Sequence, residues 1–299
     1  MTLQTHRNQR ASARMPPMLD VSPPSPRRAG EANASDEPRA GDVLLTVIVP
    51  VFNEANTVLE VLTRVLAVPQ TKQVIIVDDG STDGTGATLR SWAATRPVEL
   101  IEHPRNLGKG RAIRTALARA RGELTIIQDA DLEYDPADYP GLVAPVLGGV
   151  GDVVYGSRYL GVGRGSARAP LGACRVAVWA LNWCVRCLYG VKLTDEATCY
   201  KVFRTTALRA MDLQCERFEF CPEVTAKSCR MGLRILEVPV RYCARTVQQG
   251  KKIGWRDGVE AFRTLWRWRH WSLERPRGGA EADDPPGRPA QTVATGGTD

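Results

Sequence analysis

Acidic side chains follow three separate apolar runs of this sequence, and their positions give the first indication of chemistry. The acidic residues concerned are Glu54, Asp78, Asp79, Asp129 and Asp131. If the three runs are strands of one sheet, the carboxylates gather at one edge and repel one another unless a cation or hydrogen-bond donors compensate them. The pattern therefore indicates a bound metal ion at that edge.

Asp129 and Asp131 are the strongest candidates for metal ligands. They alternate by two, so both side chains can point to the same side of an extended segment. Such hard oxygen ligands suit Mg²⁺ or Mn²⁺, which takes one or two carboxylates together with waters and substrate phosphates. A diphosphate held in this way becomes a good leaving group, because the ion neutralises the charge that develops on the departing oxygens. An isolated Asp-x-Asp is common in solvated turns, but a place after a buried strand favours the metal site.

Other short motifs point to nucleotide binding rather than to a catalytic triad. The stretch Asp78-Asp79-Gly80-Ser81 has the composition of a turn, for which one acidic residue would suffice, so the second predicts a contact with a ribose or a base. Gly108-Lys109-Gly110 lacks the spacing of a phosphate-binding loop and predicts a helix start. No Ser/His/Asp or Cys/His triad can be identified around the three histidines, which argues against imidazole catalysis.

The elements that must position these residues alternate along the chain. Expected strands span 44–51, 74–77, 98–102 and 124–127, and expected helices begin at Thr57 and span 85–94 and 109–120. Thr57 with Glu60 three residues later has the signature of a capping box. The alternation predicts an α/β fold whose sheet is mostly parallel, with helices on both faces and ligands beyond the carboxyl ends of the strands.

Composition bounds the class of protein. The 299 residues, with 43% hydrophobic and 24% charged side chains, describe a globular chain in which no apolar stretch reaches the roughly 18 residues of a spanning helix. The eight cysteines are expected to be free thiols. The Pro-rich segments 1–43 and 273–299 are predicted to be disordered tails. Most of the net charge of +7 lies in residues 241–272, which hold eight basic and two acidic residues.

Four motifs, in this order, resemble those of family 2 glycosyltransferases with the GT-A fold. They are Pro50-Val51-Phe52-Asn53-Glu54, Val77-Asp78-Asp79-Gly80-Ser81-Thr82-Asp83-Gly84, Asn106-Leu107-Gly108-Lys109-Gly110 and Gln128-Asp129-Ala130-Asp131-Leu132. The resemblance runs from about residue 44 to 258 and is closest to the dolichyl- or polyprenyl-phosphate mannose synthases and related glucosyltransferases. It implies a GT-A domain over 44–240, followed by a basic and aromatic segment, 241–272, that closes over the site and contacts the membrane.

The resemblance also implies roles for individual residues. Binding of the nucleotide sugar would involve Pro50, Phe52, Glu54, Val77, Asp79, Asp129, Ala130, Asp131, Arg245 and Lys251. The metal would be held by Asp129, Asp131 and Glu133, the acceptor phosphate would meet Arg158, Lys201 and Lys252, and the catalytic residues would be Asp131 and Arg158. Glu133 stands where mannose synthases usually have Gln, and Thr198-Cys199-Tyr200-Lys201 stands where they tend to have Ser-Gly-Phe-Arg, so the sugar stays open between mannose and glucose.

The implied reaction is a metal-dependent, inverting transfer of mannose or glucose from GDP-mannose or UDP-glucose to polyprenyl or dolichyl phosphate. A phosphate monoester, with a second pKa of about 6, is largely dianionic at neutral pH, so its oxygen can attack without a general base. The protein would then supply alignment, together with cations that offset the repulsion between the acceptor phosphate and the donor diphosphate.

Two segments suggest how such an enzyme would reach a lipid. Residues 170–189 mix aromatic side chains with Arg175 and Arg186, which predicts an amphipathic helix in the headgroup layer, with a buried helix and snorkelling arginines as the alternative. Segment 241–272 likewise interleaves tryptophans with arginines. We therefore expect a peripheral enzyme on the cytoplasmic face of the membrane, with a separate membrane-anchoring partner left open.

Two other functions stay open at this point. A family 2 transferase acting on a soluble or cell-wall glycan would need a general base, for which Glu219 or Glu223 could serve. A nucleic-acid-binding protein could use segment 241–272, but this function leaves the three acidic strand ends unexplained. We therefore expect no nucleic-acid partner.

Overall fold

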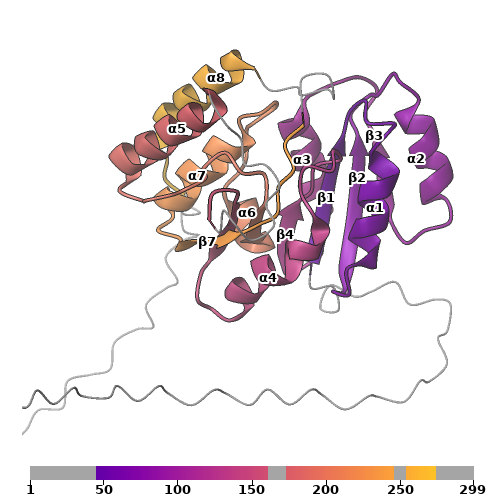
Figure 1. Ribbon diagram of the computed structural model, residues 1–299, viewed down its shortest axis with the longest axis horizontal. Coiled ribbons are helices and arrows are strands. Elements are labelled where there is room, and N and C mark those ends of the chain that lie inside the picture. The colour runs from indigo at the N-terminus through magenta and orange to yellow at the C-terminus, as the bar shows by residue number, and fades with distance from the viewer. Residues whose placement is uncertain (1–44, 161–172, 246–253, 274–299) are drawn as a thin grey trace, which may run out of the picture. The chain divides into compact units, whose positions relative to one another are not determined.

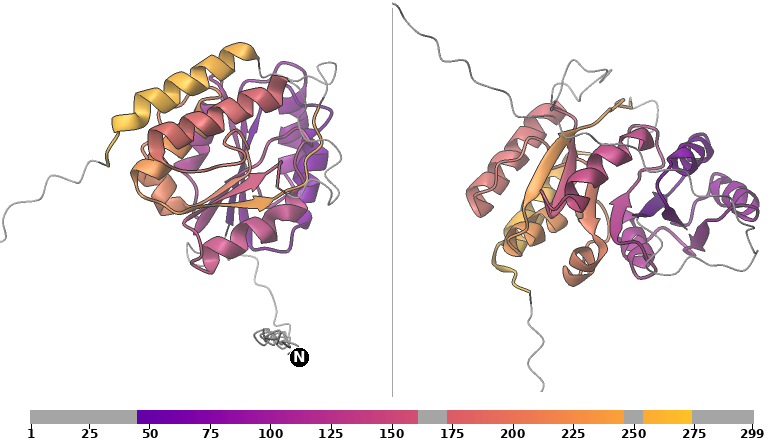
Figure 2. Two further views of the ribbon diagram at one scale, coloured as in Figure 1. Left: turned by 60° about the vertical axis from the view of Figure 1, so that its left-hand side comes forward. Right: turned by 90° about the horizontal axis from the view of Figure 1, so that it is seen from below.

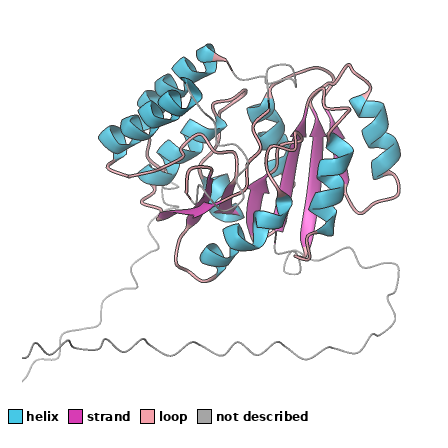
Figure 3. Ribbon diagram, viewed as in Figure 1, coloured by secondary structure: helices cyan, strands magenta, loops and turns pink. Residues whose placement is uncertain are grey.

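A seven-stranded sheet forms the centre of the protein, as a computed structural model shows (Figures 1 and 3). The structure describes residues 45–160, 173–245 and 254–273. The strand order is β3-β2-β1-β4-β6-β5-β7, and β6 is antiparallel to both of its neighbours while the other pairs are parallel. The strands are β1 (Leu45–Val51), β2 (Lys72–Asp78), β3 (Glu99–Glu102), β4 (Leu124–Ile127), β5 (Val153–Ser157), β6 (Lys201–Arg204) and β7 (Ile235–Pro239).

The central strands are apolar throughout because both of their faces are covered. In β1, Val47 and Val49 belong to the hydrophobic cluster on one face, and Ile48 belongs to the cluster on the other. In β2, Ile76 and Ile75 divide in the same way. This period of two is the alternation of a strand, and it explains the continuous apolar runs of the sequence.

Helices pack on both faces of the sheet (Figure 3). Side chains of α1 (Val58–Ala67), α2 (Thr85–Ala93) and α4 (Tyr139–Leu147) contribute to the first hydrophobic cluster. The second cluster receives side chains from α3 (Lys109–Leu117), α5 (Ala173–Tyr189), α6 (Thr205–Ala210), α7 (Phe220–Arg230) and α8 (Trp255–Arg267). Two short 3₁₀ helices, η1 (Pro136–Asp138) and η3 (Trp268–His270), complete the described elements.

The predicted α/β fold with a mostly parallel sheet is confirmed, and the predicted element boundaries need only small corrections. The helix expected to reach Ala120 ends at Leu117. The predicted capping box at Thr57 is wrong: its side chain makes no capping hydrogen bond and instead donates to Glu54 Oε2 at 2.9 Å and to the Ala130 carbonyl oxygen at 2.7 Å. This hydroxyl links the ends of two strands rather than the first turn of α1.

The predicted helices near residues 170–189 and at the C-terminal side are present as α5 and α8, which lie side by side (Figure 2). The Tyr189 hydroxyl at the end of α5 donates to the Leu265 carbonyl oxygen of α8 at 2.5 Å.

None of the helices in the described ranges has both the length and the apolar character needed to cross a membrane. Seven of the eight cysteines, those whose side chains the structure describes, are free thiols, as predicted. Apart from Leu273, the two predicted tails lie outside the described residues.

Candidate active site

The candidate site lies at one edge of the sheet, where strands end and loops begin. Because β1, β2, β4, β5 and β7 point in the same direction, their carboxyl ends meet at this edge, and the antiparallel β6 begins there. The predicted acidic residues all lie at or shortly after such strand ends. The structure therefore brings together carboxylates that are up to 77 residues apart in the chain, from Glu54 to Asp131.

Asp129 follows β4 and forms an ion pair with Lys109, the first residue of α3. The Lys109 Nζ also lies 3.2 Å from the sulfur of Cys199. Burial alone would lower the pKa of Lys109, but the Asp129 carboxylate outweighs it and raises that pKa. Burial opposes ionisation of Asp129 too, yet Lys109 keeps the pKa of this carboxyl below its usual value. Asp129 is therefore an ionised carboxylate that a cation compensates.

Asp131, two residues further, is compensated by a second cation, Arg245. The Arg245 Nη2 lies 2.9 Å from Asp131 Oδ2 and 3.0 Å from Glu54 Oε1, and its Nη1 lies 3.1 Å from Glu54 Oε2. One guanidinium thus bridges the loop after β1 and the loop after β4. Glu54, Asp131 and Arg245, each a predicted site residue, thus meet at one guanidinium group.

Glu133 fixes the segment that carries Arg245. Its Oε1 accepts a hydrogen bond from the Arg245 backbone N–H at 2.8 Å, and its Oε2 accepts one from the Tyr242 hydroxyl at 2.8 Å. Both carboxylate oxygens are thereby engaged. This arrangement departs from the predicted role of Glu133 as a metal ligand and favours a role in positioning Arg245.

Asp79 organises the loop that precedes α3. Its Oδ1 accepts from the Leu107 backbone N–H at 3.0 Å and lies 2.7 Å from His103 Nδ1, while its Oδ2 accepts from the Gly108 backbone N–H at 2.7 Å. Asp78 accepts hydrogen bonds from the backbone N–H and the hydroxyl of Ser81, as expected for a turn. The predicted nucleotide contact of Asp79 would therefore use a carboxylate that already holds the loop in place.

Arg158, after β5, is held by a buried carboxylate. Its Nε and Nη2 donate to Asp195 Oδ2 and Oδ1, both at 2.7 Å, and its backbone N–H donates to Oδ2 at 2.9 Å. The guanidinium carbon lies 5.0 Å from the centre of the Tyr242 ring, which itself is tied to Glu133. Arg158 therefore has one well-defined orientation beside the loop that carries Arg245.

Two predicted site residues, Lys201 and Val77, are fully buried. Lys201 has no exposed surface, and its Nζ donates to the Glu196 and Thr198 carbonyl oxygens, each at 2.6 Å. From there it cannot contact an acceptor phosphate, so the predicted contact between Lys201 and the acceptor is wrong. Val77 is likewise fully buried in β2, and its side chain supports the sheet edge rather than reaching a ligand.

The remaining predicted residues divide between the edge and the undescribed part of the chain. Pro50 and Phe52 are half-buried at the end of β1. Ala130 is buried between the two aspartates, and its carbonyl accepts from the Thr57 hydroxyl. Lys251 and Lys252 lie outside the described residues.

A divalent metal fits Asp129 and Asp131 only if the substrate completes its coordination. No cluster of three or more His, Cys, Asp or Glu side chains suited to a metal occurs in the described ranges. Two carboxylates are nevertheless what Mg²⁺ or Mn²⁺ takes from a protein when phosphates and waters supply the other ligands. Both aspartates already face positive charge, from Lys109 and Arg245, so the site is electrostatically suited to a cation bound together with an anion.

Lys109, Asp195 and Thr57 were missed as site residues. Lys109 stood in a motif of the resemblance to which no site role was assigned, and the local signal of Thr57 was that of a capping box. Asp195 carries no local signal, because its partner Arg158 lies 37 residues away in the chain. The available signals were the place of Lys109 in Asn106-Leu107-Gly108-Lys109-Gly110, one of the four motifs of the resemblance, and the place of Thr57 three residues after Glu54.

Comparisons with known proteins agree with this geometry. Residues 46–176 match the family model described as glycosyl transferase family 2. The chain is 32% identical over 234 residues to the undecaprenyl-phosphate mannosyltransferase of Micrococcus luteus, a match that covers 74% of this chain and 92% of that protein. It is 30% identical over 210 residues to the dodecaprenyl-phosphate galacturonate synthase of Rhizobium johnstonii, covering 67% of this chain but only 59% of the synthase.

A solved structure extends the likeness to the fold. Glucosyl-3-phosphoglycerate synthase from Mycobacterium tuberculosis, in complex with Mn²⁺, UDP and phosphoglyceric acid, superposes with a TM-score of 0.56 at 20% identity, covering 77% of this chain and 80% of that one. At this identity the match bears on the fold alone. The predicted GT-A fold is confirmed.

Proposed function

This chain belongs to glycosyl transferase family 2, and we propose that it transfers mannose or glucose from GDP-mannose or UDP-glucose to polyprenyl phosphate. Support for the lipid acceptor comes from the Micrococcus luteus mannosyltransferase, because the match extends over nearly all of that protein. The chain spans less than two thirds of the galacturonate synthase, so that relative supports the class of acceptor only.

The observation that carries the proposal is the pair of compensated carboxylates at the sheet edge. Asp129 faces Lys109, and Asp131 faces Arg245. Asp129 and Asp131 would hold a Mg²⁺ or Mn²⁺ ion, which would neutralise charge on the diphosphate as it leaves. The metal would replace Lys109 beside Asp129 and Arg245 beside Asp131. These two cations would then be available to bind the diphosphate oxygens.

The acceptor phosphate requires a cation and no base. Arg158, held in one orientation by Asp195, is the described residue best suited to this contact. Lys252, outside the described residues, stays a second candidate. Direct attack by a phosphate oxygen predicts inversion at the anomeric carbon in a single displacement.

The competing proposal, a glycan acceptor, needs a general base, and one of its two candidates is poorly placed. Glu223 is almost fully buried and accepts hydrogen bonds from the backbone N–H groups of Gln214 and Cys215, besides pairing with Lys227. Glu219 is half-buried and is the remaining candidate. A Glu219→Gln variant that keeps its transfer activity supports the phosphate acceptor, whereas loss of about 10²-fold or more would favour a general base.

We further propose that the enzyme works peripherally on the cytoplasmic face of the membrane. Exposed aromatic side chains on α5 and α8 support contact with a membrane surface, among them Trp179, Trp183 and Trp266. In this scheme segment 241–272 acts as a unit that closes the site through Arg245 and contacts the membrane through α8. A separate anchoring partner is not required by it.

The direct test is a transfer assay with purified protein, polyprenyl phosphate and a panel of GDP- and UDP-sugars, with Mg²⁺, with Mn²⁺ or with a chelator. We expect release of nucleoside diphosphate and a glycosylated lipid for one donor, and loss of both when the metal is chelated. An Asp131→Asn variant should lose activity by about 10³-fold or more, whereas Glu60→Gln, which neutralises an exposed carboxylate outside the site, should keep it. Activity without any divalent metal, or no release with any donor, would overturn the proposal.

A further inference from the structure

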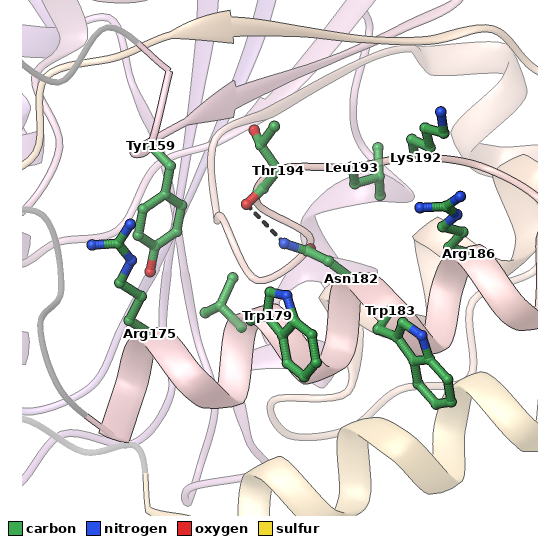
Figure 4. Close-up of a pocket in the computed structure, with 10 residues that line it drawn as sticks. Tyr159, Arg175, Trp179, Asn182, Trp183, Arg186, Lys192, Leu193 and Thr194 are labelled. Carbon is green, nitrogen blue, oxygen red and sulfur yellow. Dashed lines mark hydrogen bonds between the residues drawn. The ribbon is translucent and has the colours of Figure 1, made fainter.

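A groove runs along α5 and is lined on its other side by Tyr159 and Thr194, the chain neighbours of Arg158 and Asp195 (Figure 4). It encloses about 400 Å³ between α5, Tyr159 and residues 192–194. Figure 4 shows Arg175 and Tyr159 toward one end and Arg186 and Lys192 toward the other, with Trp179 and Trp183 along the helix between them.

The groove is positively charged and its positive charges are uncompensated. Residues 173–192 contain three basic side chains and no acidic one. Within the ranges that the structure describes, Arg175, Arg186 and Lys192 take part in no ion pair, whereas the cations of the candidate active site each face a carboxylate. A site of this kind attracts an anion.

The hydrogen-bonding groups of the groove also favour an anion, because its basic side chains are donors. The Asn182 side chain is already used: its Nδ2 donates to the Thr194 carbonyl oxygen at 2.8 Å and its Oδ1 accepts from the Glu196 backbone N–H at 2.9 Å. The Thr194 hydroxyl lies 2.7 Å from the Ser157 hydroxyl. Guanidinium and ammonium groups only donate, so the ligand must supply acceptor oxygens.

Two indole rings distinguish a lipid from a small soluble anion. Trp179 is 67% exposed and Trp183 is 60% exposed, whereas Leu181 and Val185 of the same helix are buried against the second hydrophobic cluster. Large aromatic side chains next to cations are typical of a helix that lies at the boundary between lipid headgroups and acyl chains. The neighbouring α8 continues this surface with Trp266, which is 58% exposed and lies under the guanidinium of Arg269 at 4.0 Å.

We propose that this groove, between Arg175 at one end and Arg186 with Lys192 at the other, binds the phosphate of an anionic phospholipid headgroup and so seats α5 in the membrane surface. The inference rests on the proposed function, which brings the enzyme to a lipid acceptor, but it assigns the groove to bulk membrane lipid and not to the acceptor. The groove then holds the enzyme on the bilayer while the acceptor enters at Arg158.

The test measures binding of the full chain to vesicles without donor or acceptor. Vesicles of phosphatidylcholine alone are compared with vesicles that also contain phosphatidylglycerol, and with phosphatidylcholine vesicles that contain a few per cent polyprenyl phosphate. Each basic residue near an anionic surface is worth about fivefold in membrane partition, so Arg186→Gln/Lys192→Gln should weaken binding to the phosphatidylglycerol vesicles by about 25-fold. Arg111→Gln/Arg121→Gln removes the same charge from exposed positions outside the groove and should have a much smaller effect.

A second measurement locates the bound face. Acyl chains brominated near the headgroup should quench tryptophan fluorescence of the wild type, and Trp179→Phe/Trp183→Phe should lose a large part of that quenching while keeping its circular dichroism spectrum. Equal weakening by the two charge-removing pairs, or equal binding to neutral vesicles, would overturn the proposal. So would binding only to vesicles with polyprenyl phosphate, which would make the groove part of the acceptor site.

Failure of the proposed function gives a different result. Transfer to polyprenyl phosphate dispersed in detergent does not require a bilayer, so Arg186→Gln/Lys192→Gln should keep that activity. If the wild type binds anionic vesicles through the groove but transfers no sugar in detergent, the proposed function is refuted and the proposed role of the groove in lipid binding is retained. Loss of detergent activity in this variant, with wild-type activity intact, would refute the assignment to bulk lipid.

Discussion

The ion pair between Arg158 and Asp195 allows a quantitative test of how the site is held. The Asp195 side chain is fully buried, the Arg158 side chain is 9% exposed, and two hydrogen bonds of 2.7 Å join them. Replacing Asp195 by Asn keeps the size of the side chain and an oxygen for the Arg158 backbone N–H, but leaves a buried guanidinium without its counter-charge. Breaking one side of such a pair costs about 3–5 kcal/mol.

We therefore expect Asp195→Asn to lower the free energy of unfolding by about 3–5 kcal/mol, measured by urea denaturation. In a domain of about 200 residues this corresponds to a loss of about 6–20 °C in melting temperature. Arg158→Met/Asp195→Asn should cost less than the sum of the two single variants, with a coupling energy of about 2 kcal/mol or more.

The exposed pair of Asp152 and Arg234 is a matched control. Asp152 also accepts from the backbone N–H and the Nε of its arginine, at 2.8 and 3.5 Å, but the two side chains are 38% and 62% exposed. The same cycle there should give about 1 kcal/mol or less. Additive effects at Arg158 and Asp195, or a cost below about 1 kcal/mol for Asp195→Asn, would refute the reasoning that this pair is a buried clamp.

Three further predictions concern the surroundings of the site. Burial raises the pKa of the Glu196 carboxyl from 4.5 to about 7, although Lys201 opposes the shift, so the unfolded chain loses this proton first as pH rises. The free energy of unfolding should then fall by about 3 kcal/mol between pH 4.5 and 7, and Glu196→Gln should flatten this slope in urea titrations at several pH values. Gly108, at φ +99°, would place an added Cβ 2.3 Å from the Glu216 carbonyl oxygen, so Gly108→Ala should cost several times more than Gly190→Ala, where φ is +75° and nothing lies within 4 Å. Lys109→Met leaves Asp129 without its cation and should destabilise the fold by about 1–3 kcal/mol, and a thermal-shift assay in which the variant melts like the wild type would contradict this role.

Much of the fold could be predicted because its signals are local. A strand covered on both faces must be apolar along its whole length, so β1, β2 and β4 were recognisable as runs of hydrophobic residues. The residues directly after these strands had to lie at one edge, since parallel strands end together. The sequence therefore predicts that Glu54, Asp129 and Asp131 lie at this edge, and the structure has them there.

The order of the strands and the antiparallel direction of β6 did not follow from the sequence. β6 has four residues and pairs with β4 and β5, which precede it by about 80 and 50 residues. Pairing over such separations depends on which surfaces the helices leave to be covered, and a run of four residues holds no information on its direction. The same applies to Thr57, whose sequence favours a capping box but whose hydroxyl finds Glu54 and Ala130.

By itself, the sequence determined which residue types stand at the ends of the strands, and hence that this edge gathers carboxylates and suits a metal and a diphosphate. Only the tertiary structure decided which cations compensate them, because the partners meet across distances such as the 191 residues between Glu54 and Arg245. It also decided that Lys201, a basic residue suited to a phosphate, instead points into the core toward two carbonyl oxygens. A side chain's charge is local information, but its exposure depends on everything that packs around it.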